Sequence, residues 1–165
     1  MTSEKLGKDM MNKTVNIEIW NQHVRYNLEL KHRVTIVTGF SGIGKTVLVN
    51  MIENIERYDV MSGIEIRASV DWKKLSVLKI YNLEKVMKYV KKAKVYFIDG
   101  GRSNEDVDKA LFDLLTINDA MLVYVTRYDQ SEYLKRLDYG IYTMKSQRNN
   151  EKIINYLVEN EKGAC

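Results

Sequence analysis

The chain has 165 residues, a formal net charge of +4, and 45% hydrophobic and 29% charged residues. This length suits a single domain, and the composition is typical of a folded globular protein rather than a disordered one. The single cysteine, Cys165, excludes an intramolecular disulfide, and the two histidines do not favour a histidine-based metal enzyme. No apolar run approaches the ~20 residues of a membrane-spanning helix. Residues 1–10 lack the apolar core of a secretory signal, so a cytoplasmic protein without membrane insertion is expected.

The first half of the chain predicts strands, then a glycine-rich turn and a helix. Residues 1–13 are a polar lead-in, and residues 14–165 are expected to form one domain. Apolar and polar residues alternate over 15–19 and 26–30, as in half-buried strands. Residues 34–38 are all β-branched, which is typical of a buried parallel strand. After glycines at 39–44, apolar residues recur at helical spacing: Val47, Leu48, Met51, Ile52 and Ile55.

The second half alternates predicted strands with predicted helices. Strands are expected over 63–70, 95–98, 121–125 and 141–144. Helices are expected over 82–90, from 103 or 104 to 115, over 131–137 and over 150–159. This alternation predicts an α/β fold with a mainly parallel sheet and right-handed crossovers.

The strongest motif is Gly39-Phe40-Ser41-Gly42-Ile43-Gly44-Lys45-Thr46, which fits the phosphate-loop pattern G-x-x-x-x-G-K-[ST]. Glycines allow successive backbone N–H groups to point at phosphate oxygens, and the following helix adds its positive end. Lys45 can reach the terminal phosphates, and the Thr46 hydroxyl can bind Mg²⁺. The motif follows a β-branched strand and opens an amphipathic helix, which is the context that it requires.

A second element of the same site is the run Val95-Tyr96-Phe97-Ile98-Asp99, a short apolar strand that ends in a carboxylate. Ligands of parallel α/β sheets bind at the carboxyl ends of the strands. Thr46 and Asp99 are therefore the expected Mg²⁺ ligands.

Together these motifs resemble the P-loop NTPases, in particular a reduced core of the ABC and AAA types, with strand 95–99 in the place of the Walker B element. The resemblance implies a three-layer α/β P-loop NTPase fold with a mainly parallel sheet and a small N-terminal antiparallel β-extension. It implies that Trp20 stacks on the adenine of ATP. The nucleotide contacts are then expected from Trp20 and from Gly39, Ser41, Gly42, Ile43, Gly44, Lys45, Thr46 and Val47.

The chain departs from the ABC-type pattern at positions that serve hydrolysis. Gly100 follows Asp99 where those proteins have a glutamate, Asp71 stands in place of a glutamine, and Arg127 in place of a histidine. The Leu-Ser-Gly-Gly-Gln signature is absent. Lys45, Arg127 and Asp71 are the catalytic candidates. Arg127 could stabilise the γ-phosphate or form a surface salt bridge, and Asp71 could act as a base or close a turn.

The sequence therefore predicts an ATP- and Mg²⁺-binding protein with slow hydrolase activity that couples its nucleotide state to a protein partner or to a homodimer. A small nucleotide or metabolite kinase and a non-hydrolysing ATP-dependent binding module are the alternatives. Nucleic-acid contact has weaker support, because solvated helix ends explain the basic clusters at Lys73-Lys74 and Lys91-Lys92.

Overall fold

The computed structural model describes residues 13–38, 44–79, 90–100, 105–126 and 132–160. Their strands form one nine-stranded sheet in the order β4-β1-β2-β9-β8-β3-β7-β6-β5. The strands are β1 (Val15–Trp20), β2 (Val24–Leu30), β3 (Val34–Thr38), β4 (Glu65–Ala68), β5 (Leu75–Leu78), β6 (Val95–Asp99), β7 (Met121–Val125), β8 (Tyr139–Asn149) and β9 (Lys152–Glu159). The α-helices of the described residues are α2 (Lys45–Tyr58), α4 (Glu105–Asn118) and the short α5 (Glu132–Lys135), and the 3-10 turns are η1 (Asp59–Ser62) and η2 (Trp72–Lys74).

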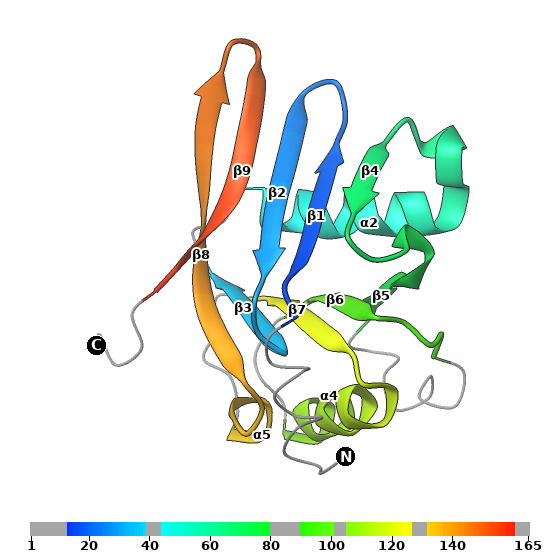
Figure 1. The fold of residues 1–165 in the computed structure, drawn as a ribbon, viewed down its shortest axis with the longest axis vertical. Coiled ribbons are helices and arrows are strands. Elements are labelled where there is room, and N and C mark those ends of the chain that lie inside the picture. The colour runs from blue at the N-terminus through cyan, green and yellow to red at the C-terminus, as the bar shows by residue number, and fades with distance from the viewer. Residues whose placement is uncertain (1–12, 39–43, 80–89, 101–104, 127–131, 161–165) are drawn as a thin grey trace.

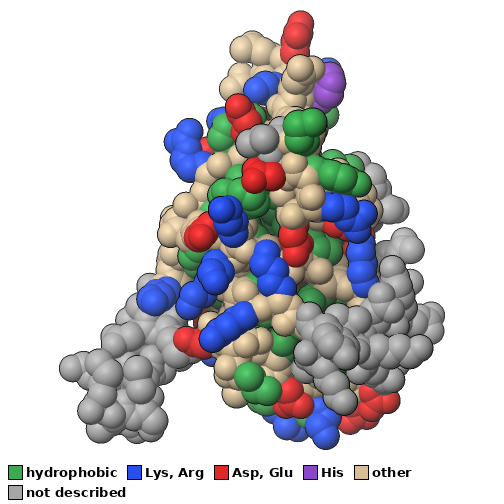
Figure 2. All heavy atoms as spheres, turned by 90° about the vertical axis from the view of Figure 1, so that its right-hand side faces the viewer, with side chains coloured by type: hydrophobic (Ala, Val, Ile, Leu, Met, Phe, Trp, Pro, Cys, Tyr) green, Lys and Arg blue, Asp and Glu red, His purple; other side chains and the backbone are tan. Residues whose placement is uncertain are grey.

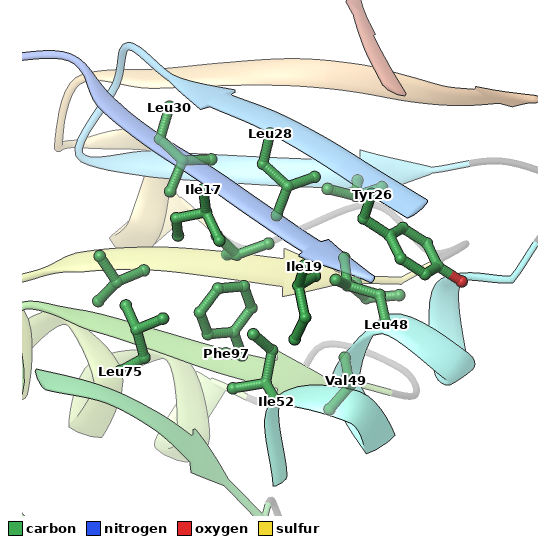
Figure 3. Packing of buried hydrophobic residues seen from close by; sticks show 14 of the residues in the cluster. Ile17, Ile19, Tyr26, Leu28, Leu30, Leu48, Val49, Ile52, Leu75 and Phe97 are labelled. Atoms are coloured by element: carbon green, nitrogen blue, oxygen red, sulfur yellow. The ribbon is translucent and has the colours of Figure 1, made fainter. Parts of the chain in front are cut away.

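The sheet curls into a half-barrel around α2 (Figure 1). The helix buries Leu48, Val49 and Ile52 against β1 and β2 on one side and against β5, β6 and β7 on the other. Figure 3 shows that Leu48, Val49 and Ile52 of α2 share one core with the labelled residues of β1 and β2 and with Phe97 and Leu75. A second apolar cluster lies on the opposite face of β3, β6 and β7, where α4 and α5 pack. Burial on both faces explains why these central strands are apolar throughout.

The predicted three-layer P-loop NTPase fold with a mainly parallel sheet is wrong. The sheet mixes parallel and antiparallel pairings, and strands outnumber helices among the described residues. The segment 150–159 forms strand β9, which pairs antiparallel with β8 and parallel with β2. Because β9 joins the N-terminal strands to the central ones, the expected β-extension is part of one continuous curled sheet.

The predicted helix over 150–159 is wrong, and two local features of this segment suit the strand that replaces it. Asn150 adopts a left-handed backbone conformation with φ +56° and closes a tight turn between β8 and β9. Asparagine is one of the few residues that tolerate this conformation, and it is favoured in hairpin turns. Ile153, Ile154 and Val158 are β-branched and therefore fit a pleated strand better than a helix.

Several predicted elements are confirmed. β1, β2, β3, β6 and β7 match the predicted strands at 15–19, 26–30, 34–38, 95–98 and 121–125, and α2 and α4 match the predicted helices that begin after the glycine-rich turn and after residue 104. The segment 63–70 contains β4, which pairs antiparallel with β1 instead of joining the parallel strands. β5 was not predicted, and most of the helix predicted over 82–90 lies outside the described residues. No helix in the described ranges is long and apolar enough to span a bilayer.

Candidate functional site

The candidate site lies where β3, β7 and β6 end side by side. The Thr126 N–H donates to the Val37 carbonyl at 3.0 Å, and the Gly100 N–H donates to the Val125 carbonyl at 2.8 Å. These bonds extend the sheet beyond its last paired residues, so the segments that leave β3, β7 and β6 start from one edge. β7 lies between β3 and β6 in the sheet. This is the edge at which parallel strands place ligand-binding loops.

Gly44 begins α2 in a conformation that requires glycine. Its φ is +92°, in the left-handed region, and it occupies the N-cap position of the 14-residue helix. The helix therefore starts immediately after the glycine-rich segment, and its first N–H groups and the positive end of its dipole lie at the site. Lys45 is buried (9% exposed), whereas Val47 in the same turn is 46% exposed.

Thr46 and Asp99 meet at the start of α2 and the end of β6. The Thr46 hydroxyl donates a hydrogen bond to Oδ2 of Asp99 at 3.0 Å, and both residues are exposed. The two residues predicted as Mg²⁺ ligands are 53 positions apart in the chain, and the fold brings their oxygens together. Hydroxyl and carboxylate oxygens are the hard donors that Mg²⁺ prefers. Among the described residues, no group of three or more His, Cys, Asp or Glu side chains could hold a metal.

Tyr26 supports the first turn of α2 from the neighbouring strand β2. Its hydroxyl donates to the Gly44 carbonyl at 2.6 Å, and the ring is buried (Figure 3). Burial raises the pKa of this hydroxyl to about 12, although a hydrogen bond with Asn155 lowers it, so the group is a donor at neutral pH. Asn155 of β9 is also buried and is hydrogen-bonded through Oδ1 to the Ser146 hydroxyl of β8. A chain of polar contacts thus connects the β8–β9 hairpin with the start of α2.

Gly100 is closed to any side chain by the ring of Tyr124. A Cβ atom at this position would lie 2.8 Å from both Cζ and the hydroxyl oxygen of Tyr124, and closer still to Cε1. Tyr124 is fully buried in the second apolar cluster, so a shift of its ring would disturb that packing. Burial, with a smaller contribution from Asp108, raises the pKa of the Tyr124 hydroxyl, which has no hydrogen-bond partner among the described residues. The position of the ABC-type glutamate is therefore sterically occupied.

Trp20 lies apart from Thr46 and Asp99. It lines a pocket with Ile55 and Asp59, which belong to the last turn of α2 and to the following 3-10 turn. Thr46 and Ile55 are nine residues apart on one helix, or about 13 Å at 1.5 Å per residue. In the β1–β2 pairing, Ile19 and Tyr26 face the core, whereas Trp20 and Arg25 form the next pair, on the opposite face. Stacking of Trp20 on a nucleotide held at Thr46 is not supported by this placement.

Asp71 also lies apart from the site. It precedes β5, and its carboxylate accepts a hydrogen bond from the Lys73 backbone N–H at 3.0 Å. β5 and β6 are parallel, with Leu75 opposite Val95 and Leu78 opposite Ile98. Asp71 is therefore at the amino end of this pair of strands and Asp99 at the carboxyl end. Its observed role is the turn, the second of the two roles predicted for it.

Five predicted site residues lie outside the described part of the chain: Gly39, Ser41, Gly42, Ile43 and Arg127. Sequence reasoning missed the supporting residues Tyr26, Asn155 and Tyr124. The available signal for Tyr26 was a hydroxyl on the apolar side of an alternating strand, because a buried tyrosine usually needs a hydrogen-bond partner. Nothing in the sequence connects Tyr124 with Gly100, since only the pairing of β6 with β7 brings them together.

In comparisons with known proteins, no family model matches the chain, and no curated protein matches it.

Proposed function

We propose that this protein binds ATP together with Mg²⁺ at the glycine-rich segment 39–46 and Asp99. The observation that carries the proposal is the contact between the Thr46 hydroxyl and the Asp99 carboxylate at 3.0 Å. In the phosphate-loop motif the Ser or Thr after the lysine binds the metal, and a carboxylate at the end of a neighbouring strand assists it. The sequence motif and the geometry of the described residues support the same chemistry independently.

Each residue of the site has a distinct task in this proposal. The backbone N–H groups at the start of α2 bind phosphate oxygens, and the Lys45 ammonium neutralises the terminal phosphates. Thr46 and Asp99 would hold Mg²⁺, which supplies charge neutralisation to the β- and γ-phosphate oxygens when it is bound. With two protein oxygens at hand, the remaining positions around the ion would be filled by phosphate and water, as is usual for Mg²⁺.

A non-hydrolysing or slowly hydrolysing binding module is the second candidate, and the contact between Gly100 and Tyr124 favours it. A positioned general base contributes about 10²–10⁴-fold to a reaction rate. Tyr124 excludes a carboxylate from position 100, and Asp71 lies at the other end of its strand pair. The first fact argues against ATP hydrolysis without an acceptor, and the second argues against a kinase reaction in which Asp71 is the base. We infer that nucleotide binding regulates contact with a partner protein or a second copy of the chain.

Replacing Asp99 with asparagine is expected to remove most of the Mg²⁺ dependence of ATP binding. Asparagine keeps the size of the side chain and a hydrogen-bonding oxygen but loses the negative charge that favours the cation. The ATP affinity of the unaltered protein should fall when EDTA replaces Mg²⁺, by about 10- to 100-fold, as for a lost charge-assisted contact. The Asp99→Asn variant should show little change. Isothermal titration calorimetry measures both affinities.

Asp71→Asn is the matched control, because the same charge is lost at the other end of the strand pair. This variant should keep the full Mg²⁺ dependence. Equal Mg²⁺ dependence in the Asp99→Asn variant and in the unaltered protein would contradict the assignment of the metal ligands. Absence of any ATP binding by the unaltered protein would contradict the proposed function itself.

A further inference from the structure

The ring of Trp20 lies next to two arginines on the outer face of the curled sheet. The Arg25 guanidinium lies 4.7 Å from the centroid of the Trp20 ring, and the Arg67 guanidinium lies 5.9 Å from it. The three residues come from β1, β2 and β4, which are adjacent in the sheet. In Figure 1 these strands lie in front of α2, so the helix covers their inner face and leaves the outer face without a described helix.

A pocket of about 470 Å³ adjoins the Trp20 ring at the end of the sheet where β1 turns into β2. Its lining consists of Trp20, Asn21, Gln22, Gly63, Ile64, Glu65 and Lys152. The Asn21 side chain is held in place because its Oδ1 accepts from the backbone N–H groups of His23 and Val24, at 2.8 and 2.9 Å. This volume falls within the usual range of about 300–1,000 Å³ for small-ligand sites. It is adequate for one nucleobase with its sugar.

Three cations lie in the pocket or next to it: Lys152 lines it, and Arg25 and Arg67 lie next to the Trp20 ring. Arg25, Arg67 and Lys152 form no salt bridge within the described ranges. The Nε of Arg25 is buried and has no hydrogen-bond partner in the same part of the chain. Glu65 is the only carboxylate in the lining. Figure 2 shows that basic and acidic side chains are interspersed over the adjoining side of the molecule. This side therefore has no continuous basic surface, and the proposed contacts with phosphate are limited to the cations near Trp20.

We propose that single-stranded nucleic acid binds here, with one base in the pocket at Trp20 and the flanking phosphates on Lys152 in the lining and on Arg25 and Arg67 next to the Trp20 ring. Tryptophan and stacked guanidinium groups are the surfaces on which unpaired bases stack, and arginine is suited to phosphate recognition. The Glu65 carboxylate can accept a hydrogen bond from the amino group of cytosine or adenine, which thymine lacks. A duplex is disfavoured because its bases are stacked on each other and cannot enter a pocket.

The site is separate from the proposed ATP site. Trp20 is at the end of α2 opposite to Thr46, and its arginine neighbours are on the outer face of the sheet. The nucleic-acid proposal therefore does not depend on ATP binding, and either proposal can be contradicted while the other holds.

Binding is tested by fluorescence anisotropy with labelled oligodeoxynucleotides of about 12 nucleotides, which covers the usual site sizes. At about 50 mM salt, where phosphate contacts are strong, the full chain should bind dC and dA oligomers more tightly than dT. Trp20→Leu should weaken binding by about 5- to 100-fold, the range for one lost base–aromatic stack. Arg67→Gln should weaken binding and lower the slope of log affinity against log salt by about 0.7.

Lys109→Gln is the matched charge control, because Lys109 is exposed on α4, on the other side of the central strands. It should bind within about twofold of the unaltered chain, since Lys109 does not belong to the pocket. Arg67 is exposed, so its variant keeps the test valid if Trp20→Leu fails to fold. Absence of oligonucleotide binding, or equal binding by Arg67→Gln, would overturn the proposal.

Discussion

Gly100→Ala is expected to lower the free energy of unfolding by about 1–3 kcal/mol, the usual cost of forcing an extra methyl group into a packed core. The added Cβ would lie 2.8 Å from Cζ and from the hydroxyl oxygen of the fully buried Tyr124. For a chain of this size, the corresponding fall in Tm is about 2–12 °C. Urea denaturation followed by circular dichroism measures the difference.

A double-mutant cycle with Tyr124→Leu identifies the cause. The smaller side chain removes the ring that the new Cβ meets, although it leaves a cavity of its own. In the Tyr124→Leu background, Gly100→Ala should therefore cost less than it does alone, because residues in contact are not additive. Equal costs in both backgrounds would show that Tyr124 does not close position 100.

The same contact predicts that hydrolysis cannot be restored simply by placing a glutamate after Asp99. Gly100→Glu adds a longer and charged side chain at a position with no room for a methyl group. Loss of stability, rather than a gain of ATPase activity, is expected from this substitution. A glutamate at position 100 would therefore need a shift of Tyr124, which β7 places beside the end of β6.

Gly44→Ala is expected to weaken both the fold and ATP binding. An alanine at φ +92° is strained, and a left-handed backbone typically costs a residue with a Cβ about 1–2 kcal/mol. The new Cβ would also lie 2.7 Å from the Tyr26 hydroxyl. A displaced first turn of α2 would misplace the N–H groups that bind phosphate, so ATP affinity should fall further than stability alone explains. Thermal denaturation with and without Mg-ATP measures both effects.

Gly63→Ala is the control for the strain that an alanine suffers in a left-handed backbone conformation. Gly63 has a similar φ of +72°, but a Cβ there would meet nothing within 4 Å. This variant should show the strain without the contact and should keep its stabilisation by ATP. If Gly44→Ala is stabilised by ATP as strongly as the unaltered protein, Gly44 does not shape the nucleotide site.

Local patterns were sufficient to predict the central part of the fold. The β-branched run at 34–38 and the apolar runs at 95–98 and 121–125 are strands that are buried on both faces, so each carries a strong signal of its own. The first turn of α4 contains the acidic residues expected at a helix start, Glu105 and Asp106. The glycine-rich motif correctly predicted that a helix follows it, and α2 begins at Lys45.

The sheet order beyond the central strands could not be predicted in the same way. Residues 150–159 contain apolar residues that fit a helix or a strand, and the decision depends on pairing with β2, more than 120 positions earlier in the chain. The location of Trp20 follows from alternation in β1, which places it on the face opposite to the core-facing Ile19. The expectation that Trp20 stacks on adenine came from its position in the sequence relative to ABC-type domains. That position does not specify the face of β1 on which the side chain lies.

The most direct test of nucleotide binding is the affinity of the purified protein for Mg-ATP beside a Lys45→Ala variant, measured by calorimetry with ADP formation followed in the same samples. We expect one-to-one binding, an affinity lower by about 10- to 100-fold in Lys45→Ala because a charge-assisted contact to phosphate is lost, and little ADP in either sample. Thermal denaturation shows that the variant is folded, and the exposed Thr46→Val is a second probe of the same site. Equal affinity of the folded Lys45→Ala variant and the unaltered protein, or no binding by either, would contradict a nucleotide site at this loop.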